Sequence, residues 1–323
     1  MSVLEQVLEN GGFGITAEMA PPKGCDFSHE LKLAECLKGL VHGVNVTDMQ
    51  SASLKASSLG FCIALKQAGL EPIIQMTGRD RSRMAIMGEM LSAYSFGIDT
   101  MLALTGDHPT VGDVPQSKPV YDLDSVGILN MLSLMEETGR DCGGNVLDGN
   151  VVDKETGEVI DKSKTPVFYK GAAVTPVYEP MFLQINKLKQ KVDAGAKYVQ
   201  TQGIFDLEYF KRFMDEVDKA GIKTNIMAGI IPLKAAGMAK YMNQFVPGIA
   251  VPQSMIDRLA AAAAEGKEKG IKGLPMQMGI EMAAEMIAEI KAQNLCDGVH
   301  IMAIGAEKNV PTILEKAGID INA

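Results

Sequence analysis

Residues 193–202 read DAGAKYVQTQ, and this stretch contains the junction on which the fold assignment depends. Asp193-Ala194-Gly195 ends a segment of helical periodicity, because glycine readily takes the left-handed conformation that terminates a helix. Residues 196–202 then form a short apolar run that finishes on polar side chains, as a strand does where it leaves a sheet. A helix that leads through a glycine into a strand indicates alternating helices and parallel strands.

The same junction recurs at Gln67-Ala68-Gly69 and at Lys219-Ala220-Gly221. Eight short apolar runs follow this pattern, and each precedes a longer segment of helical periodicity. The expected strands are residues 14–20, 43–48, 71–77, 99–105, 167–174, 196–202, 224–231 and 298–304. Because eight parallel strands with intervening helices form a closed barrel, we predict a (β/α)8 TIM barrel, as one domain spanning residues 1–323.

The segments between these strands are amphipathic and predict the outer helices of the barrel. They are residues 30–40, 53–68, 81–96, 125–138, 182–194, 207–220, 234–245 and 279–293, with an extra helix over 254–266.

One stretch interrupts the alternation. Residues 141–164 are polar and rich in Gly and Asp, with two short Val/Ile pieces around Glu155-Thr156-Gly157. This pattern predicts a β-hairpin insertion within residues 141–166, before strand five. Such an insertion would lie on the face of the barrel opposite the loops that carry chemistry. Both a simple surface excursion and a partner-binding arm are consistent with it.

Composition narrows the class of protein. The chain has 323 residues, 46% hydrophobic and 22% charged, and a formal net charge of −9, which argues against a nucleic-acid partner. Its five cysteines are scattered, with no spacing typical of a metal site. No apolar run reaches the roughly 18 residues of a membrane span, and the N-terminus carries no basic leader. We therefore expect a cytoplasmic protein, without resident metal, that forms an oligomer.

Polar residues are concentrated at the ends of the predicted strands. In a (β/α)8 barrel the active site is built from the carboxyl ends of the strands and the loops after them. These side chains therefore predict one polar mouth, made of Glu18, Thr47, Asp48, Gln75, Thr77, Thr105, Gly106, Asp107, Thr175, Gln200 and Gln202.

Glu18 is the first candidate for chemistry. It lies between Ala17 and Met19, so an ionisable carboxyl stands among apolar neighbours. Burial disfavours the charged form of a carboxyl, which suits it to donate a proton near neutral pH. A structural carboxylate bonded to the backbone is the alternative. Asp107 follows a Thr-Gly turn and fits either a ligand cradle or a cap, and His108 next to it fits a loop residue better than a catalyst.

No Walker A or G-x-G-x-x-G fingerprint follows a strand, so a Rossmann-type dinucleotide domain is not expected. A cofactor phosphate would need other cations. The candidates are Arg79, Arg81, Lys187, Lys189 and Lys191, each of which also fits a solvated helix-face charge.

Six motifs, in order along the chain, resemble methylenetetrahydrofolate reductases from about residue 12 to residue 305. They are AEMAPP at 17–22, NVTD at 45–48, QMTGRDR at 75–81, ALTGDHP at 103–109, GAAVTP at 171–176 and KVDAGAKYVQTQGIFD at 191–206.

The resemblance implies reduction of 5,10-methylenetetrahydrofolate to 5-methyltetrahydrofolate, by hydride transfer from N5 of a flavin. FAD is the expected flavin, with FMN as the alternative. Glu18 matches the family's general acid, and Asp107 matches the aspartate near flavin and pterin. Gln202 and Phe205 match substrate-contacting positions. The positions that match the flavin site are Thr47, Asp48, Gln75, Thr105, Gly106, Asp107, Ala172 and Lys191.

Several positions depart from the commonest pattern of that family. Thr105 replaces an arginine, Gln75 a histidine and Asp48 a tyrosine. Met242 replaces a phenylalanine where a nicotinamide cofactor packs, and Ala306 replaces an arginine. The folate-side residues are retained, so we expect the reductive chemistry with a different electron source. The resemblance to the variant reductases of anaerobic metabolism implies a zinc- and iron-sulfur-containing partner subunit as the donor.

Two other functions fit the same barrel. A pterin-dependent methyltransferase would use strand-end carboxylates to orient its pterin without any flavin. A non-catalytic subunit of a one-carbon complex would use the barrel as a scaffold and the hairpin as its contact.

Overall fold

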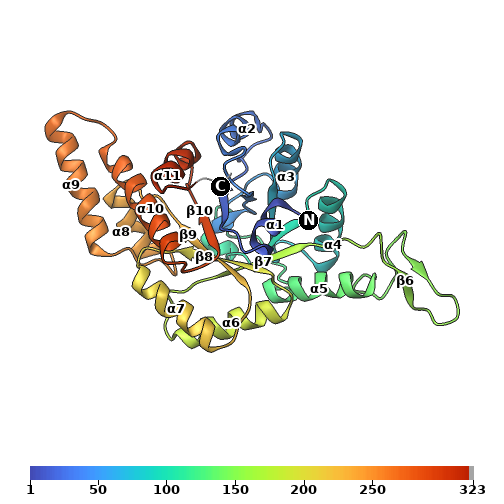
Figure 1. Ribbon diagram of the computed structural model, residues 1–323. Coiled ribbons are helices and arrows are strands. Elements are labelled where there is room, and N and C mark those ends of the chain that lie inside the picture. The colour runs from blue at the N-terminus through green and yellow to red at the C-terminus, as the bar shows by residue number, and fades with distance from the viewer. Residues whose placement is uncertain (320–323) are drawn as a thin grey trace.

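Eight parallel strands close into a barrel in the computed structural model, which describes residues 1–319 (Figure 1). The order around the barrel is β1-β10-β9-β8-β7-β4-β3-β2. The strands are β1 (Gly14–Met19), β2 (Gly43–Val46), β3 (Pro72–Thr77), β4 (Thr100–Leu104), β7 (Tyr169–Val174), β8 (Tyr198–Gly203), β9 (Asn225–Ile230) and β10 (Gly298–Ile301). The predicted (β/α)8 fold is thereby confirmed.

Helices cover the outside of this barrel. They are α2 (Ser28–Ala34), α3 (Ser58–Gln67), α4 (Arg83–Ser95), α5 (Ser125–Thr138), α6 (Met181–Asp193), α7 (Leu207–Lys219), α8 (Ala236–Phe245), α9 (Gln253–Lys269), α10 (Leu274–Ala292) and α11 (Val310–Lys316). Short 3-10 turns occur at Glu35–Leu37, Gln50–Ala52, Pro109–Val111 and Glu307–Asn309.

Side chains along each strand alternate between the helices and the barrel interior, as the two-residue period of a strand requires. On β1, Ile15 and Ala17 belong to the large core that packs against the helices. Thr16 and Glu18 face inward. The hydrogen bond between Asn45 of β2 and Gln200 of β8 crosses the interior, because these two strands are not neighbours. This alternation decides which residues can reach the mouth.

An additional helix, α1 (Val3–Glu9), packs against the amino end of the barrel. Its Leu4 and Leu8 are buried against inward-facing apolar side chains that include Ile73, Tyr198 and Met227. The interior is therefore filled with apolar groups at this end. Polar inward-facing residues lie nearer the carboxyl ends of the strands.

The helix expected over 53–68 begins only at Ser58. Ser53 and Ser57 have extended backbone, with ψ angles of 136° and 144°, which is incompatible with a right-handed helix. Ser57 then caps α3, because its hydroxyl accepts a hydrogen bond from the Gly60 amide at 3.2 Å. The loop after β2 is consequently longer than the sequence predicted.

The insertion before strand five is a two-stranded antiparallel sheet of β5 (Val151–Val152) and β6 (Val159–Asp161). Figure 1 shows it as an arm that extends away from the barrel beyond the end of α5. It connects α5 to the amino end of β7 and so lies on the face opposite the mouth.

Within residues 1–319, no helix combines the length and the apolar character needed to cross a membrane. That part of the chain also contains no group of three or more His, Cys, Asp or Glu side chains placed to hold a metal ion.

Candidate active site at the mouth of the barrel

A cavity of about 220 Å³ opens at the carboxyl ends of the strands, and we call it the glutamate cavity. It brings together three of the residues that the sequence singled out, namely Glu18, Gln75 and Gln202. The other lining residues are Leu102, Leu104, Ala173, Val174, Thr175, Gln200, Thr201, His300 and Met302. Six different strands contribute to it, as is usual for the active site of a (β/α)8 barrel.

Glu18 is held by one of its two carboxylate oxygens. Gln75 Nε2 donates to Oε2 at 3.2 Å, and His300 Nε2 lies 3.6 Å from the same atom. The other oxygen, Oε1, has no hydrogen-bond partner within the described residues, and 24% of the side chain is exposed. Glu18 therefore presents one free oxygen, which suits exchange of a proton with a bound ligand.

A second cavity of about 240 Å³ adjoins the first, with which it shares Leu104 and the stretch 173–175. We call it the lysine cavity, because Lys187 and Lys191 of α6 line it together with Thr105. Neither lysine forms an ion pair with any part of the chain that the structure describes. Lys191 Nζ donates to the main-chain oxygen of Ala173.

The lysine cavity has the electrostatics of an anion site. Burial lowers the pKa of Lys191, and the neighbouring positive charge of Lys187 lowers it further. A negatively charged ligand would relieve this repulsion between two cations one helical turn apart. Lys189 differs, because it is exposed and paired with Asp193 at 2.7 Å. Only two of the three helix lysines are therefore available to a ligand.

Arg79 and Arg81, which follow β3, both form ion pairs with carboxylates of the protein. Arg81 binds Asp48 through two nitrogens, at 2.7 and 3.1 Å, and also contacts Glu89 at 2.9 Å. Arg79 pairs with Asp80 at 2.7 Å and is almost fully buried. Neither arginine has the freedom expected of a phosphate-binding cation.

Asp48 was expected at the flavin site, but its carboxylate is used by the ion pair with Arg81. Its side chain is fully buried, and both oxygens are used by Arg81 and by the amide and hydroxyl of Thr77. The side chain consequently has no free oxygen for a flavin. The pattern placed it at the mouth, whereas the structure places it in a buried ion pair between the loops after β2 and β3.

Other expected residues are arranged along the rim of the mouth. Thr47 is buried, and its hydroxyl has no hydrogen-bond partner in the described structure. Gly106 has a φ of +90°, and a Cβ there would lie 2.9 Å from the Cβ of Arg79, so glycine is required. Asp107 is exposed and accepts a hydrogen bond from the Ser51 amide at 2.9 Å. It does not line the glutamate cavity.

Ala172 requires a correction. It was expected to line a flavin, but its side chain is fully buried in the core beneath the helices. Strand alternation explains this: Lys170 and Ala172 face outward on β7, where Lys170 pairs with Glu136 of α5. The inward neighbour Ala173 lines both the glutamate and the lysine cavities.

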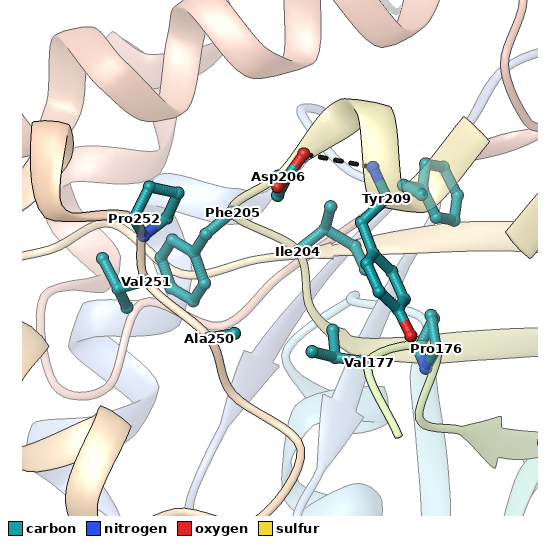
Figure 2. Close-up of a pocket in the computed structure, with 10 residues that line it drawn as sticks. Pro176, Val177, Ile204, Phe205, Asp206, Tyr209, Ala250, Val251 and Pro252 are labelled. Carbon is teal, nitrogen blue, oxygen red and sulfur yellow. Dashed lines mark hydrogen bonds between the residues drawn. The ribbon is translucent and has the colours of Figure 1, made fainter. Parts of the chain in front are cut away.

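Phe205 lies in a third, apolar cavity of about 200 Å³ next to the mouth. Figure 2 shows its ring beside Val251 and Pro252, with Ile204 and Tyr209 on the other side of the cavity. Only 6% of Phe205 is exposed. The residue is therefore close to the mouth but does not contact the cavity that contains Glu18.

The sequence analysis gave His300 no role, although it is the histidine nearest to Glu18. A usable signal existed, because residues 298, 300 and 302 fall on the inward phase of the last strand. His108, the histidine with the more suggestive sequence context, is exposed and bonds Thr110 of its own loop. It is a loop residue, as expected.

A larger cavity, of about 600 Å³, lies at the opposite end of the barrel. Its lining includes Glu9, Asn225 and Asp297, close to the amino ends of the strands. In (β/α)8 enzymes this end contributes stability and the carboxyl end contributes chemistry. The glutamate and lysine cavities are therefore the stronger candidates for a functional site.

The mouth of the closed (β/α)8 barrel thus combines the carboxylate of Glu18 with an adjoining cavity lined by two lysines. The family model described as methylenetetrahydrofolate reductase matches residues 3–152 and 155–318. The chain belongs to that family.

Individual relatives agree with this assignment. The chain is 23% identical over 273 residues to a probable methylenetetrahydrofolate reductase (NADPH) from Caenorhabditis elegans, covering 83% of the chain and 34% of the relative. It is 29% identical over 175 residues to the 5,10-methylenetetrahydrofolate reductase of Salmonella typhimurium, covering 54% of the chain and 48% of the relative. The matched region thus spans half or less of the length of these relatives.

A solved structure shares the fold at low sequence identity. It is a protein from Clostridium thermocellum that binds two copies of 5-methyl-5,6,7,8-tetrahydrofolic acid. The TM-score is 0.61 at 14% identity, and the match covers 98% of this chain and 100% of that one.

Proposed function

We propose that this chain reduces 5,10-methylenetetrahydrofolate to 5-methyltetrahydrofolate with a bound flavin, FAD in the first instance. The observation that carries the proposal is the carboxylate of Glu18, of which Gln75 binds only Oε2, beside a cavity lined by two lysines that have no ion-pair partner among residues 1–319. Membership of the methylenetetrahydrofolate reductase family supports it. So does the Clostridium thermocellum protein of the same fold, whose ligand is the proposed product.

The residues at the mouth suit a flavin in two respects. Lys187 and Lys191 supply uncompensated positive charge for its phosphates. The buried hydroxyl of Thr47 lacks a partner, and a buried polar group of this kind is normally satisfied by a ligand or water. When bound, the flavin supplies the hydride that reduces the one-carbon unit.

Glu18 supplies the proton for the same reaction. Its free Oε1 donates to a ring nitrogen of the bound folate, so that the five-membered ring opens and the one-carbon unit becomes an iminium ion able to accept a hydride. Gln75 holds Oε2 during this step through its 3.2 Å hydrogen bond. Gln202, which lines the same cavity, contacts the folate in this proposal. Asp107, whose carboxylate accepts a hydrogen bond from the Ser51 amide at the rim, is proposed to bind the pterin.

The direct test has two parts. Purified protein is expected to be yellow, or to become so with added FAD, and to lose its absorbance near 450 nm on chemical reduction. The reduced protein should then be reoxidised by methylenetetrahydrofolate with stoichiometric formation of 5-methyltetrahydrofolate. A protein that binds folate but no flavin would favour the methyltransferase alternative, and one that binds neither would favour the scaffold.

Lys187→Met and Lys191→Met are each expected to weaken FAD binding about 10- to 100-fold, the range for loss of a hydrogen bond to a charged group. Affinity is measured by fluorescence quenching of FAD. Wild-type affinity should also fall as pH rises through the lowered pKa of Lys191, because phosphate binding favours its charged form.

Lys189→Met is the matched control, since Lys189 lies on the same helix but is exposed and paired with Asp193. Its FAD affinity should equal that of the wild type. Equal weakening in all three variants would remove the lysine cavity from the proposal.

We further propose that a partner subunit containing zinc and iron-sulfur centres supplies the electrons. Met242 supports this, because it lies where related enzymes carry a phenylalanine that packs against a nicotinamide cofactor, and it is 6% exposed here. Ala306, which stands where those enzymes carry an arginine, is also 6% exposed. Met242 is packed in the apolar cluster beneath α8 and α9. The flavin-loaded chain alone should therefore oxidise NADH far more slowly than it turns over with a low-potential donor, and matching rates would exclude this electron source.

A further inference from the structure

Four polar side chains form a layer inside the barrel, directly below Glu18. They are Thr16, Asn45, Gln200 and His300, from β1, β2, β8 and β10, and each is at most 3% exposed. Buried polar groups are retained where their hydrogen bonds are satisfied by one another, and such networks fix side-chain orientation. In this layer the direction of each hydrogen bond fixes the direction of the next.

The two amides of the layer orient each other. Asn45 Nδ2 donates to Gln200 Oε1 at 2.8 Å, and Gln200 Nε2 donates back to Asn45 Oδ1 at 3.1 Å. The second proton of Gln200 Nε2 goes to Thr16 Oγ1, also at 3.1 Å. All protons of the Gln200 amide are thus assigned, and the Thr16 oxygen acts as an acceptor from this side.

The Thr16 hydroxyl therefore has its own proton to give, and its remaining partner is His300 Nδ1 at 2.9 Å. A nitrogen that accepts a hydrogen bond carries no proton, so the proton of the neutral imidazole is on Nε2. Nε2 lies 3.6 Å from Oε2 of Glu18. The layer directs an N–H group of His300 at the carboxylate.

We propose that His300 is the positioning residue for Glu18, with its tautomer set by Thr16 and the Asn45–Gln200 pair. The inference rests on the proposed function, because it assigns Glu18 the role of proton donor. His300 and Gln75 hold Oε2 from two strands and leave Oε1 directed toward the ligand. Glu18 is the one charged side chain that faces His300 from β1, and Gly229 on β9 offers none.

This polar layer orients the Glu18 carboxylate, but it offers no path by which Glu18 could be reprotonated. Beyond His300 the hydrogen bonds lead to a threonine hydroxyl and then to two amides, which have no titratable proton in the physiological range. Glu18 must therefore recover its proton from the solvent side of the glutamate cavity.

The tautomer is tested without flavin or folate by two-dimensional nitrogen–proton NMR of the imidazole rings. The chain has four histidines, and loss of one signal in His300→Gln assigns His300. We expect the Nε2–H tautomer in the wild type and a mixture of tautomers in Thr16→Val, which keeps the shape of the side chain but lacks its hydroxyl. An Nδ1–H tautomer in the wild type would overturn the inference.

The role of His300 in positioning Glu18 is tested by replacing His300 with two amide side chains of different length. His300→Gln can place its amide nitrogen near the position of Nε2 and should keep folate reduction within about tenfold of wild type. His300→Asn reaches only the position of Nδ1 and should lose about 10²-fold in kcat, since small displacements at a reacting centre cost this much. KM for folate and the rate of chemical flavin reduction should stay unchanged in both.

Equal losses in the two variants, or a change confined to KM, would contradict the positioning role. Thermal unfolding of each variant identifies any that fail to fold, and Thr16→Val then provides the same test through the tautomer. The two proposals can be tested independently. If the wild type never reduces folate, the proposed function is wrong, but the NMR result still decides which tautomer His300 adopts.

Discussion

Replacing Glu18 by glutamine should leave the flavin bound and reduce the rate of methylenetetrahydrofolate reduction roughly 10²- to 10⁴-fold, the usual contribution of a general acid. Glutamine has nearly the shape of glutamate and can still accept the hydrogen bond from Gln75 through its amide oxygen, with His300 Nε2 3.6 Å away in the wild type. It cannot donate a proton in the way a carboxylic acid does. The measurement is single-turnover oxidation of pre-reduced enzyme by methylenetetrahydrofolate, alongside the absorbance of the bound flavin.

Glu71→Gln is the matched control for this substitution. Glu71 precedes β3 at the amino end of the barrel, where it pairs with Lys66 at 2.7 Å, so its loss removes one negative charge far from the mouth. Its folate reduction should be that of the wild type. Near-normal turnover by Glu18→Gln would remove Glu18 from the acid role, and loss of flavin in that variant would indicate a structural carboxylate instead.

The barrel was predictable because its signals are local. The Asp193-Ala194-Gly195 junction ends α6 and leads into β8 within a few residues, and the structure reproduces it. Strand positions are fixed by short apolar runs, which tertiary contacts do not alter. The start of α3 was missed because Ser53 and Ser57 take an extended backbone, which no apolar pattern reveals.

The candidate site was only partly predictable. Glu18, Gln75 and Gln202 meet in one cavity because the carboxyl ends of parallel strands converge, a rule that needs no coordinates. Orientation was the harder part. Ala172 and Ala173 look equivalent in sequence, yet the strand phase sends one to the core and the other to both cavities.

Pairing between distant loops was also beyond the pattern. Arg79 and Arg81 were plausible phosphate ligands as isolated cations, and only the folded chain reveals their carboxylate partners. The Lys187–Lys191 pair is distinguished from Lys189 by the same kind of information, because a lysine that lacks a counter-ion cannot be recognised before its neighbours are known.

The buried Arg81–Asp48 ion pair is expected to contribute strongly to the stability of the fold. Asp48→Asn should lower the free energy of unfolding by roughly 3–5 kcal/mol, the range for removing one partner of a buried ion pair. The substitution leaves the Arg81 charge buried with Glu89 as its one remaining carboxylate. The measurement is urea unfolding followed by circular dichroism, with FAD affinity determined below the onset of unfolding.

Asp122→Asn is the matched control, because Asp122 also binds an arginine through both oxygens, at 2.7 to 3.2 Å, but on the surface. Half of the Arg83 side chain is exposed, so solvent screens the Arg83–Asp122 ion pair. The urea midpoint of unfolding of Asp122→Asn should therefore stay close to that of the wild type. Both ion pairs are bidentate, so a difference in stability between the two variants measures the effect of burial.

A double variant separates the structural role of Asp48 from a flavin contact. In Asp48→Asn/Arg81→Met the uncompensated charge is gone, and much of the lost stability should return, since buried pairs are often replaceable by apolar groups. If Asp48 acts only through Arg81, the folded double variant should bind FAD as the wild type does. Recovered stability with weak FAD binding would instead restore Asp48 to the flavin site that the sequence assigned to it.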